Sequence, residues 1–196
     1  MEDTIKKELR RQFVHASGAM LVPLAFIFGK FPVGAASLVL AFAIFILAEH
    51  KNENGKKINT DKSNILPIHS VFEKFERSGG NYRGAFYFYL ASAVSLFLFP
   101  LPIAMISITV LALGDSFSTA VGIFGRNRIF YNRKKTWEGT LAGFAAAFAG
   151  CYLISPQLAF IAAFVGMAVE SLPLKTDDNL TIPIMTGIAL SVLSAI

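Results

Sequence analysis

The sequence has few charged residues and a single cysteine. Only 16% of its 196 residues are Asp, Glu, Lys or Arg, whereas an average soluble domain has about 25%. Cys151 has no second cysteine with which to form an internal disulfide. Hydrophobic residues make up 54% of the chain, more than a soluble fold of this size could bury. The composition therefore excludes disorder, fibrous repeats and ordinary soluble enzymes, and indicates an integral membrane protein.

Apolar runs separated by Pro, Gly or polar clusters predict about seven transmembrane helices, each of which needs about 20 residues. The runs are 13–29, 32–48, 84–99, 102–123, 137–154, 157–173 and 180–196. We therefore expect an all-α, polytopic membrane protein in which residues 1–196 form a single transmembrane catalytic domain. In the fifth run, Gly139, Gly143 and Ala147 recur every four residues, a spacing that permits close packing against another helix.

The basic residues support this topology. Seven alternating spans place all 18 Lys and Arg residues except Lys30 on one side of the membrane, and the acidic residues sort the same way. The positive-inside rule then predicts a cytoplasmic N-terminus and an active site facing the cytoplasm, in the cell membrane or a membrane of the endoplasmic reticulum type. The opposite face is almost free of polar residues, which argues against a small transporter, the alternative from another functional class.

The loop between the second and third runs contains a second kind of helical pattern. Residues 65–77 place apolar side chains on one helical face and charged residues on the other; the apolar residues are Ile65, Ile68, Val71, Phe72 and Phe75. This pattern predicts a short amphipathic helix lying at the membrane surface. A loop helix packed against the bundle is the alternative.

Asp115 is the most informative polar residue, because it follows an apolar run and is expected to lie within a span. A carboxylate in a membrane is costly and usually functional. On a helix, Asp115 shares a face with Thr119 and Gly122, and these oxygens could bind a hard cation such as Mg²⁺. The alternative is a buried structural pair with an arginine.

The segment after Asp115 combines glycines with positive charge. Gly122 and Gly125 would let the backbone approach a ligand closely, and basic groups would neutralise phosphate. The basic residues are Arg126, Arg128, Arg133, Lys134 and Lys135. A cytoplasmic loop is basic in any membrane protein, so a purely topological role for the arginines stays open.

Lys134 and Lys135 directly precede a predicted helix start, where free N–H groups favour anions. Thr136 is the expected N-cap, and Glu138 lies in the first turn. Glu138 is either a second metal ligand or a charge that complements the helix dipole.

Two further polar groups complete the candidate set. Glu170 ends the sixth run, and Asp177, Asp178 and Asn179 follow it on a short loop that could hold Mg²⁺. A solvated turn or helix capping would also explain this loop. Near the N-terminus, His15 lies one helical turn after Arg11, where it is either part of the site or structural.

Carboxylates, a basic loop and a helix N-terminus on one membrane face suit phosphoryl or nucleotidyl transfer with Mg²⁺. Since the active residues lie on helices and short loops in a membrane, the second substrate is expected to be a lipid. The sequence contains neither a Walker A motif nor the protein-kinase motifs.

Several motifs resemble those of the CTP-dependent lipid kinase family, which includes dolichol kinase, phytol kinase and a diacylglycerol kinase. The specific stretches run from Gly114-Asp115 to Gly143 and from Glu170 to Pro183, and Arg11, His15 and Gly18 also fit. The resemblance implies transfer of the γ-phosphate of CTP to a lipid alcohol, with polyprenol or dolichol favoured. No nucleic acid partner is expected, and the oligomeric state is open.

Carried over by position, the resemblance makes Asp115, Lys135 and Glu138 the catalytic residues. Metal ligands would be Asp115, Glu138, Glu170 and Asp178. Nucleotide contacts would come from Gly122, Gly125, Arg126, Arg128, Lys134, Thr136, Asn179 and His15. The competing interpretation is a phosphatidate or CDP-archaeol cytidylyltransferase, although the His-Gly-Gly and Asp-Arg-x-Asp motifs of the phosphatidate enzyme are absent.

Overall fold

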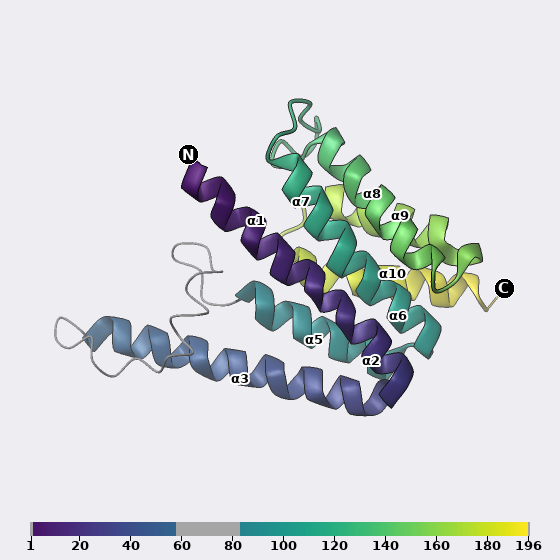
Figure 1. The fold of residues 1–196 in the computed structure, drawn as a ribbon, viewed down its shortest axis with the longest axis horizontal. Coiled ribbons are helices and arrows are strands. Elements are labelled where there is room, and N and C mark those ends of the chain that lie inside the picture. The colour runs from purple at the N-terminus through teal and green to yellow at the C-terminus, as the bar shows by residue number, and fades with distance from the viewer. Residues whose placement is uncertain (1, 58–82, 196) are drawn as a thin grey trace.

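A computed structural model describes residues 2–57 and 83–195, and this part of the chain is helical apart from turns and loops (Figure 1). The elements are α1 (Glu2–Ser17), η1 (Gly18–Met20), α2 (Leu21–Phe28), α3 (Lys30–Lys57), α5 (Arg83–Leu98), α6 (Leu101–Thr109), η3 (Val110–Asp115), α7 (Ser116–Gly122), α8 (Trp137–Tyr152), α9 (Pro156–Ser171) and α10 (Asp178–Leu193). The predicted all-α class is confirmed for these residues.

The described elements join into seven helical rods that correspond to the seven apolar runs. The first rod is α1–η1–α2 and the fourth is α6–η3–α7, while each remaining α-helix is a rod of its own. Within residues 2–57 and 83–195, three rods are long and apolar enough to cross a membrane, judged by length and composition: Asp3–Phe28, Lys30–Ala48 and Leu101–Gly122. Shorter apolar helices occupy Arg83–Leu98, Pro156–Ser171 and Asp178–Leu193.

The end of the second rod differs from the predicted run. Helix α3 continues to Lys57, nine residues beyond the predicted run, because hydropathy marks the apolar span and not the end of the helix. The amphipathic helix predicted at 65–77 lies outside the described residues.

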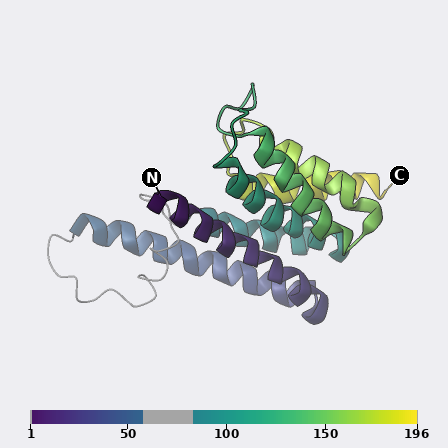
Figure 2. The ribbon, with the colours of Figure 1, turned by 45° about the horizontal axis from the view of Figure 1, so that its top comes forward.

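The connections between rods separate the molecule into a polar and an apolar end. Gly29, with a φ of 88°, ends α2, and Pro100 and Ser155 precede the first turns of α6 and α9. In Figures 1 and 2 these three turns lie near the C-terminus, whereas the N-terminus and the segment 123–136 lie at the other end. The charged start of α1 and the basic segment 123–136 therefore lie at one end of the described structure, which we call the polar end.

The rod α6–η3–α7 is the centre of the bundle. Of its most apolar 18-residue window, 78% is buried, compared with 11% for the first rod. It packs against α8, α9, α10, α1 and α2. Because Asp115 lies on this rod, the carboxylate is carried into the interior.

Glycines allow α8 to lie directly against the central rod, as the four-residue spacing predicted. A Cβ atom at Gly143 would be 2.6 Å from the carbonyl oxygen of Gly114 and 2.9 Å from the Cβ of Ser118. A Cβ at Gly139 would be 2.5 Å from the carbonyl oxygen of Ser118. The two backbones thus approach more closely than any side chain permits.

This packing predicts that Gly143→Ala destabilises the protein by about 1–3 kcal/mol, because the new methyl group meets backbone atoms that cannot rotate away. Thermal unfolding in detergent would measure the loss. The matched control is Gly84→Ala, where the nearest atom lies at an ordinary 3.6 Å, and no destabilisation is expected. Equal effects of the two substitutions would contradict the close approach.

Candidate functional site

Asp115 lies at the end of η3, a π-helical turn within the central rod. The π-helical turns of proteins are rare and frequently occur at functional sites. The carboxylate is buried, and its Oδ2 atom lies 3.5 Å from Nε2 of His15 on α1. It also interacts electrostatically with Lys135 and Asp178. Asp115 and Lys135 are therefore near enough to interact electrostatically at the polar end.

The ammonium group of Lys135 joins α9 and α10. It donates hydrogen bonds to Oε1 of Glu170 and, at 3.0 Å, to Oδ2 of Asp178. The same Glu170 oxygen accepts a 2.7 Å hydrogen bond from the hydroxyl of Ser118 on α7. We call Asp115, Ser118, Lys135, Glu170 and Asp178 the polar cluster.

Burial and neighbouring charges shift the pKa of Lys135 in opposite directions. Burial alone lowers the pKa of the ammonium group, but the carboxylates of Glu170, Asp115 and Asp178 outweigh it and raise the pKa above its ordinary value. Lys135 is therefore a permanent positive charge at working pH. A fixed cation beside carboxylates, at the inner end of a loop, is suited to holding phosphate oxygens.

Asp177 organises the start of α10. Its Oδ1 atom accepts hydrogen bonds from the backbone N–H of Asn179 at 3.0 Å and from the Asn179 side chain at 2.8 Å. Asp177 is therefore the N-cap, which leaves Asp178 free to face Lys135. Helix capping was the alternative role for Asp178 and Asn179. In the structure, Asp177 is the N-cap of α10 instead.

The segment 123–136 is a hairpin-like loop. Arg128 and Thr136 form an isolated bridge, and the N–H of Ile129 donates to the carbonyl of Lys135 at 3.1 Å. The fully buried Ile129 anchors it, and Asn132 donates at 3.0 Å to the carbonyl of Ser171. These contacts place Lys135 over the end of α9.

Glu138 fastens this loop. One carboxylate oxygen accepts hydrogen bonds from the backbone N–H groups of Arg126 and Asn127 at 3.0 and 3.1 Å, and a further 2.8 Å bond from the Asn127 amide. Thr136 is the N-cap of α8, as predicted, and accepts a 3.2 Å bond from the N–H of Gly139. Both side chains thus have structural partners in the protein.

The predicted phosphate-binding glycines have packing roles as well. A Cβ atom at Gly125 would be 2.5 Å from Oγ1 of Thr136, and one at Gly122 would be 3.2 Å from the same atom. Their lack of side chains lets the loop fold back onto the start of α8. Whether they also face a ligand stays a prediction.

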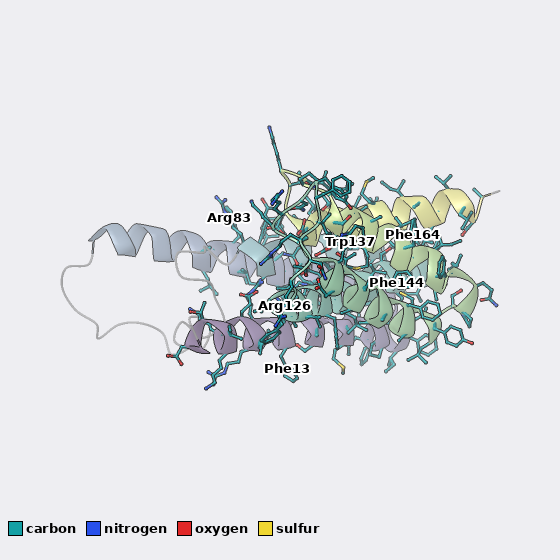
Figure 3. All side chains as sticks on the ribbon, turned by 90° about the horizontal axis from the view of Figure 1, so that it is seen from above. Phe13, Arg83, Arg126, Trp137, Phe144 and Phe164 are labelled. Carbon is teal, nitrogen blue, oxygen red and sulfur yellow. The ribbon has the colours of Figure 1, made fainter. Side chains whose placement is uncertain are left out.

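The loop cations separate into two groups. Lys135 is turned inward, whereas Arg126, Arg128, Arg133 and Lys134 are exposed. Figure 3 shows Arg126 at the same end of the molecule as Arg83, with Phe144 and Phe164 further along the bundle. The exposed cations can therefore meet a ligand arriving from water, but they are not part of the buried cluster.

Among the described residues, no group of three or more His, Cys, Asp or Glu side chains is arranged to hold a metal ion. Several buried oxygen atoms nevertheless lack a hydrogen-bond partner, including Oε2 of Glu170 and Oδ1 of Asn179. Mg²⁺ is commonly held by one or two carboxylates together with substrate phosphates and water, so oxygens of this kind suit the ion. A magnesium site that combines them with Asp115 stays a prediction.

Two contacts of the site were not predicted. Ser118 bonds Glu170 from 52 residues away, and Asn132 bonds Ser171 from 39 residues away. Ser118 lies three residues after Asp115, so helical spacing from Asp115 was the available signal. No comparable signal marks Asn132, which lies in an irregular loop.

Several known proteins are similar in sequence to this chain. Over 95% of its length the chain is 27% identical to phytol kinase 1, chloroplastic, of Arabidopsis thaliana, and covers 67% of that protein. An uncharacterized protein of Methanocaldococcus jannaschii is 28% identical over 92% of this chain and 91% of its own length. A probable phytol kinase 2 of Glycine max is 28% identical over 53% of this chain and 43% of that protein.

Kinases of a lipid alcohol are thus among the homologues of this chain. The resemblance to the family that includes phytol kinase, drawn from the motifs, is confirmed. No model of a protein family matches the chain, and no solved structure matches it significantly.

The pairing of Lys135 with Glu170 predicts a strong effect on stability. Glu170 is fully buried, so Lys135→Met strands a carboxylate without its counter-charge and should cost about 3 kcal/mol of unfolding free energy. The double variant Lys135→Met, Glu170→Gln should recover part of this loss. Thermal unfolding in detergent measures both.

The neighbouring exposed lysine provides the control. Lys134→Met should change the unfolding temperature little, because a solvent-exposed cation contributes little to stability. A double variant no more stable than Lys135→Met alone would contradict the pairing argument.

Proposed function

We propose that the protein is a membrane-embedded kinase that transfers the γ-phosphate of CTP to the hydroxyl group of an isoprenoid alcohol of the phytol, polyprenol or dolichol type. The observation that carries the proposal is the polar cluster. An inward-facing ammonium group lies among three carboxylates at the polar end of an otherwise apolar bundle. The phytol kinase relatives support this class of reaction and of acceptor.

The arrangement suggests how a triphosphate would bind. Asp178 is partly exposed, with 32% of its side chain accessible, whereas Glu170 is fully buried. A phosphate oxygen can therefore replace Asp178 at Lys135 while Glu170 keeps the ammonium in place. The exposed Arg126, Arg128 and Lys134 would meet the triphosphate as it arrives from the water layer, beside Gly122, Gly125 and the N-terminus of α8 at Thr136.

Asp115, Asp178 and the free oxygens of Glu170 and Asn179 are the proposed Mg²⁺ ligands. When bound, the ion would neutralise charge on the transferring phosphate. Glu138 is left out of this set, because both of its oxygens accept hydrogen bonds from the loop. The chain's own residues would then position the reactants: Lys135 would hold a phosphate group, and the lipid alcohol would come from the surrounding bilayer.

The proposed topology follows the charge pattern. Seven spans with a cytoplasmic N-terminus put the polar end in the cytoplasm, where CTP is available. The lipid hydroxyl lies at the membrane surface, so both substrates can reach Asp115 only at this end.

The direct test is phosphate transfer by the purified protein in detergent, with phytol, geranylgeraniol, a polyprenol, dolichol and diacylglycerol as acceptors and with CTP and ATP compared. We expect a phosphorylated isoprenoid alcohol and release of CDP. Release of pyrophosphate with phosphatidate as substrate would instead show a cytidylyltransferase. No product with any acceptor would overturn the proposal.

Asp115→Asn should reduce turnover by about 100-fold or more, because it removes a charge that positions the metal and phosphate. Asp177→Asn is the matched control: Asn is as good an N-cap as Asp, so most activity should remain. Steady-state rates with saturating CTP check both. Near-normal turnover in Asp115→Asn would remove this residue from the site.

A further inference from the structure

His15 is held by contacts within the protein, and binding a nucleotide would not require these contacts. Its side chain is only 11% exposed, and the ring packs edge-on against Phe88 of α5, with 4.7 Å between ring centroids. A Cβ atom at Gly18 would overlap the Phe88 ring, so the glycine one turn later makes room for this packing. The imidazole is therefore held by its surroundings before any substrate binds.

His15 faces the carboxylate at the end of the π-helical turn. Its Nε2 atom has no hydrogen-bond partner but lies 3.5 Å from Oδ2 of Asp115. Asp115 is the last residue of η3, the π-helical turn Val110–Asp115. A largely buried side chain of α1 thus lies beside the carboxylate that ends this turn.

This geometry separates His15 from the phosphate-binding groups. Lys135 and the exposed cations come from the loop 123–136, whereas His15 comes from the first helix and faces Asp115 across the contact of α1 with α7 and η3. Arg11, one turn before it, donates a 3.1 Å hydrogen bond to Glu8 and also interacts electrostatically with Asp115. The first helix therefore contributes to the carboxylate side of the site.

We propose that His15 is a positioning residue: it holds the Asp115 carboxylate, at the end of the π-helical turn, in one geometry, and in this way makes α1 part of the catalytic site. The proposal rests on the proposed kinase function, and it replaces the nucleotide-binding role expected for His15 from the sequence. A misplacement of a reacting group by about 1 Å can cost a rate factor of about 100.

Two amide variants test the contact with Asp115. The side-chain nitrogen of His15→Gln lies near the position of Nε2 and keeps this contact, whereas that of His15→Asn lies near Nδ1 and does not reach Asp115. We expect kcat of His15→Asn to fall about 10- to 100-fold with the KM for CTP nearly unchanged. His15→Gln should recover most of the lost rate. Val14→Ala, an exposed position on the same helix, is the control and should match the unmodified protein.

The kinetic outcomes decide the proposal. A raised KM for CTP at unchanged kcat would make His15 a nucleotide ligand and overturn it. Equal rates for His15→Asn and His15→Gln, whether high or low, would show that the contact with Asp115 does not matter for turnover.

A stability measurement keeps the test independent of the kinase assignment. The unfolding temperatures of His15→Phe, Asp115→Asn and the double variant are compared with that of the unmodified protein. If His15 and Asp115 interact, the double variant should unfold at a temperature different from that expected from the sum of the single shifts. Additive shifts would refute the pairing, whereas coupling without any kinase activity would refute only the proposed function.

Discussion

The buried carboxylate of Glu170 is the constraint on which the polar end depends. A charged group without solvent needs a counter-charge and hydrogen bonds, and Glu170 obtains them from Lys135 and Ser118. To deliver Lys135, the loop 123–136 must fold back over the end of α9, and to balance the second side of the ammonium, α10 must begin with Asp178 beside it. One buried charge thus sets the relative position of α7, α9, α10 and the loop.

Close packing makes this convergence possible. Gly139 and Gly143 let α8 lie on the central rod at backbone distance, which brings the end of the loop beside Ser118. The loop also folds closely onto the start of α8. Gly122 and Gly125 leave no room for a side chain there, because Thr136 packs directly against them. Gly122 and Gly125, which the sequence suggested as phosphate-binding glycines, therefore have packing contacts that build the loop. The arginines of the loop are exposed and face water.

Particular residues show how far sequence reasoning reached. Asp115 was predicted because a carboxylate interrupts an apolar run, and Lys135 because it precedes a helix capped by Thr136; both lie at the polar end. Glu138 accepts hydrogen bonds from backbone N–H groups twelve and eleven residues earlier in an irregular loop. Sequence spacing alone could not predict these contacts or distinguish a metal ligand from a residue that stabilises the loop. The π-helical turn at Val110–Asp115 likewise has no signature in a run of apolar residues.

For the described residues, the sequence by itself determined the helical class, the number of rods and the gathering of charge at one end, because these follow from local hydropathy and from the cost of placing charge in lipid. Only the tertiary structure decided which acid pairs with Lys135, that Asp177 caps α10, and that His15 faces Asp115. These are contacts between groups far apart in the chain, and helix packing, which depends on the shapes of all the rods together, selects them.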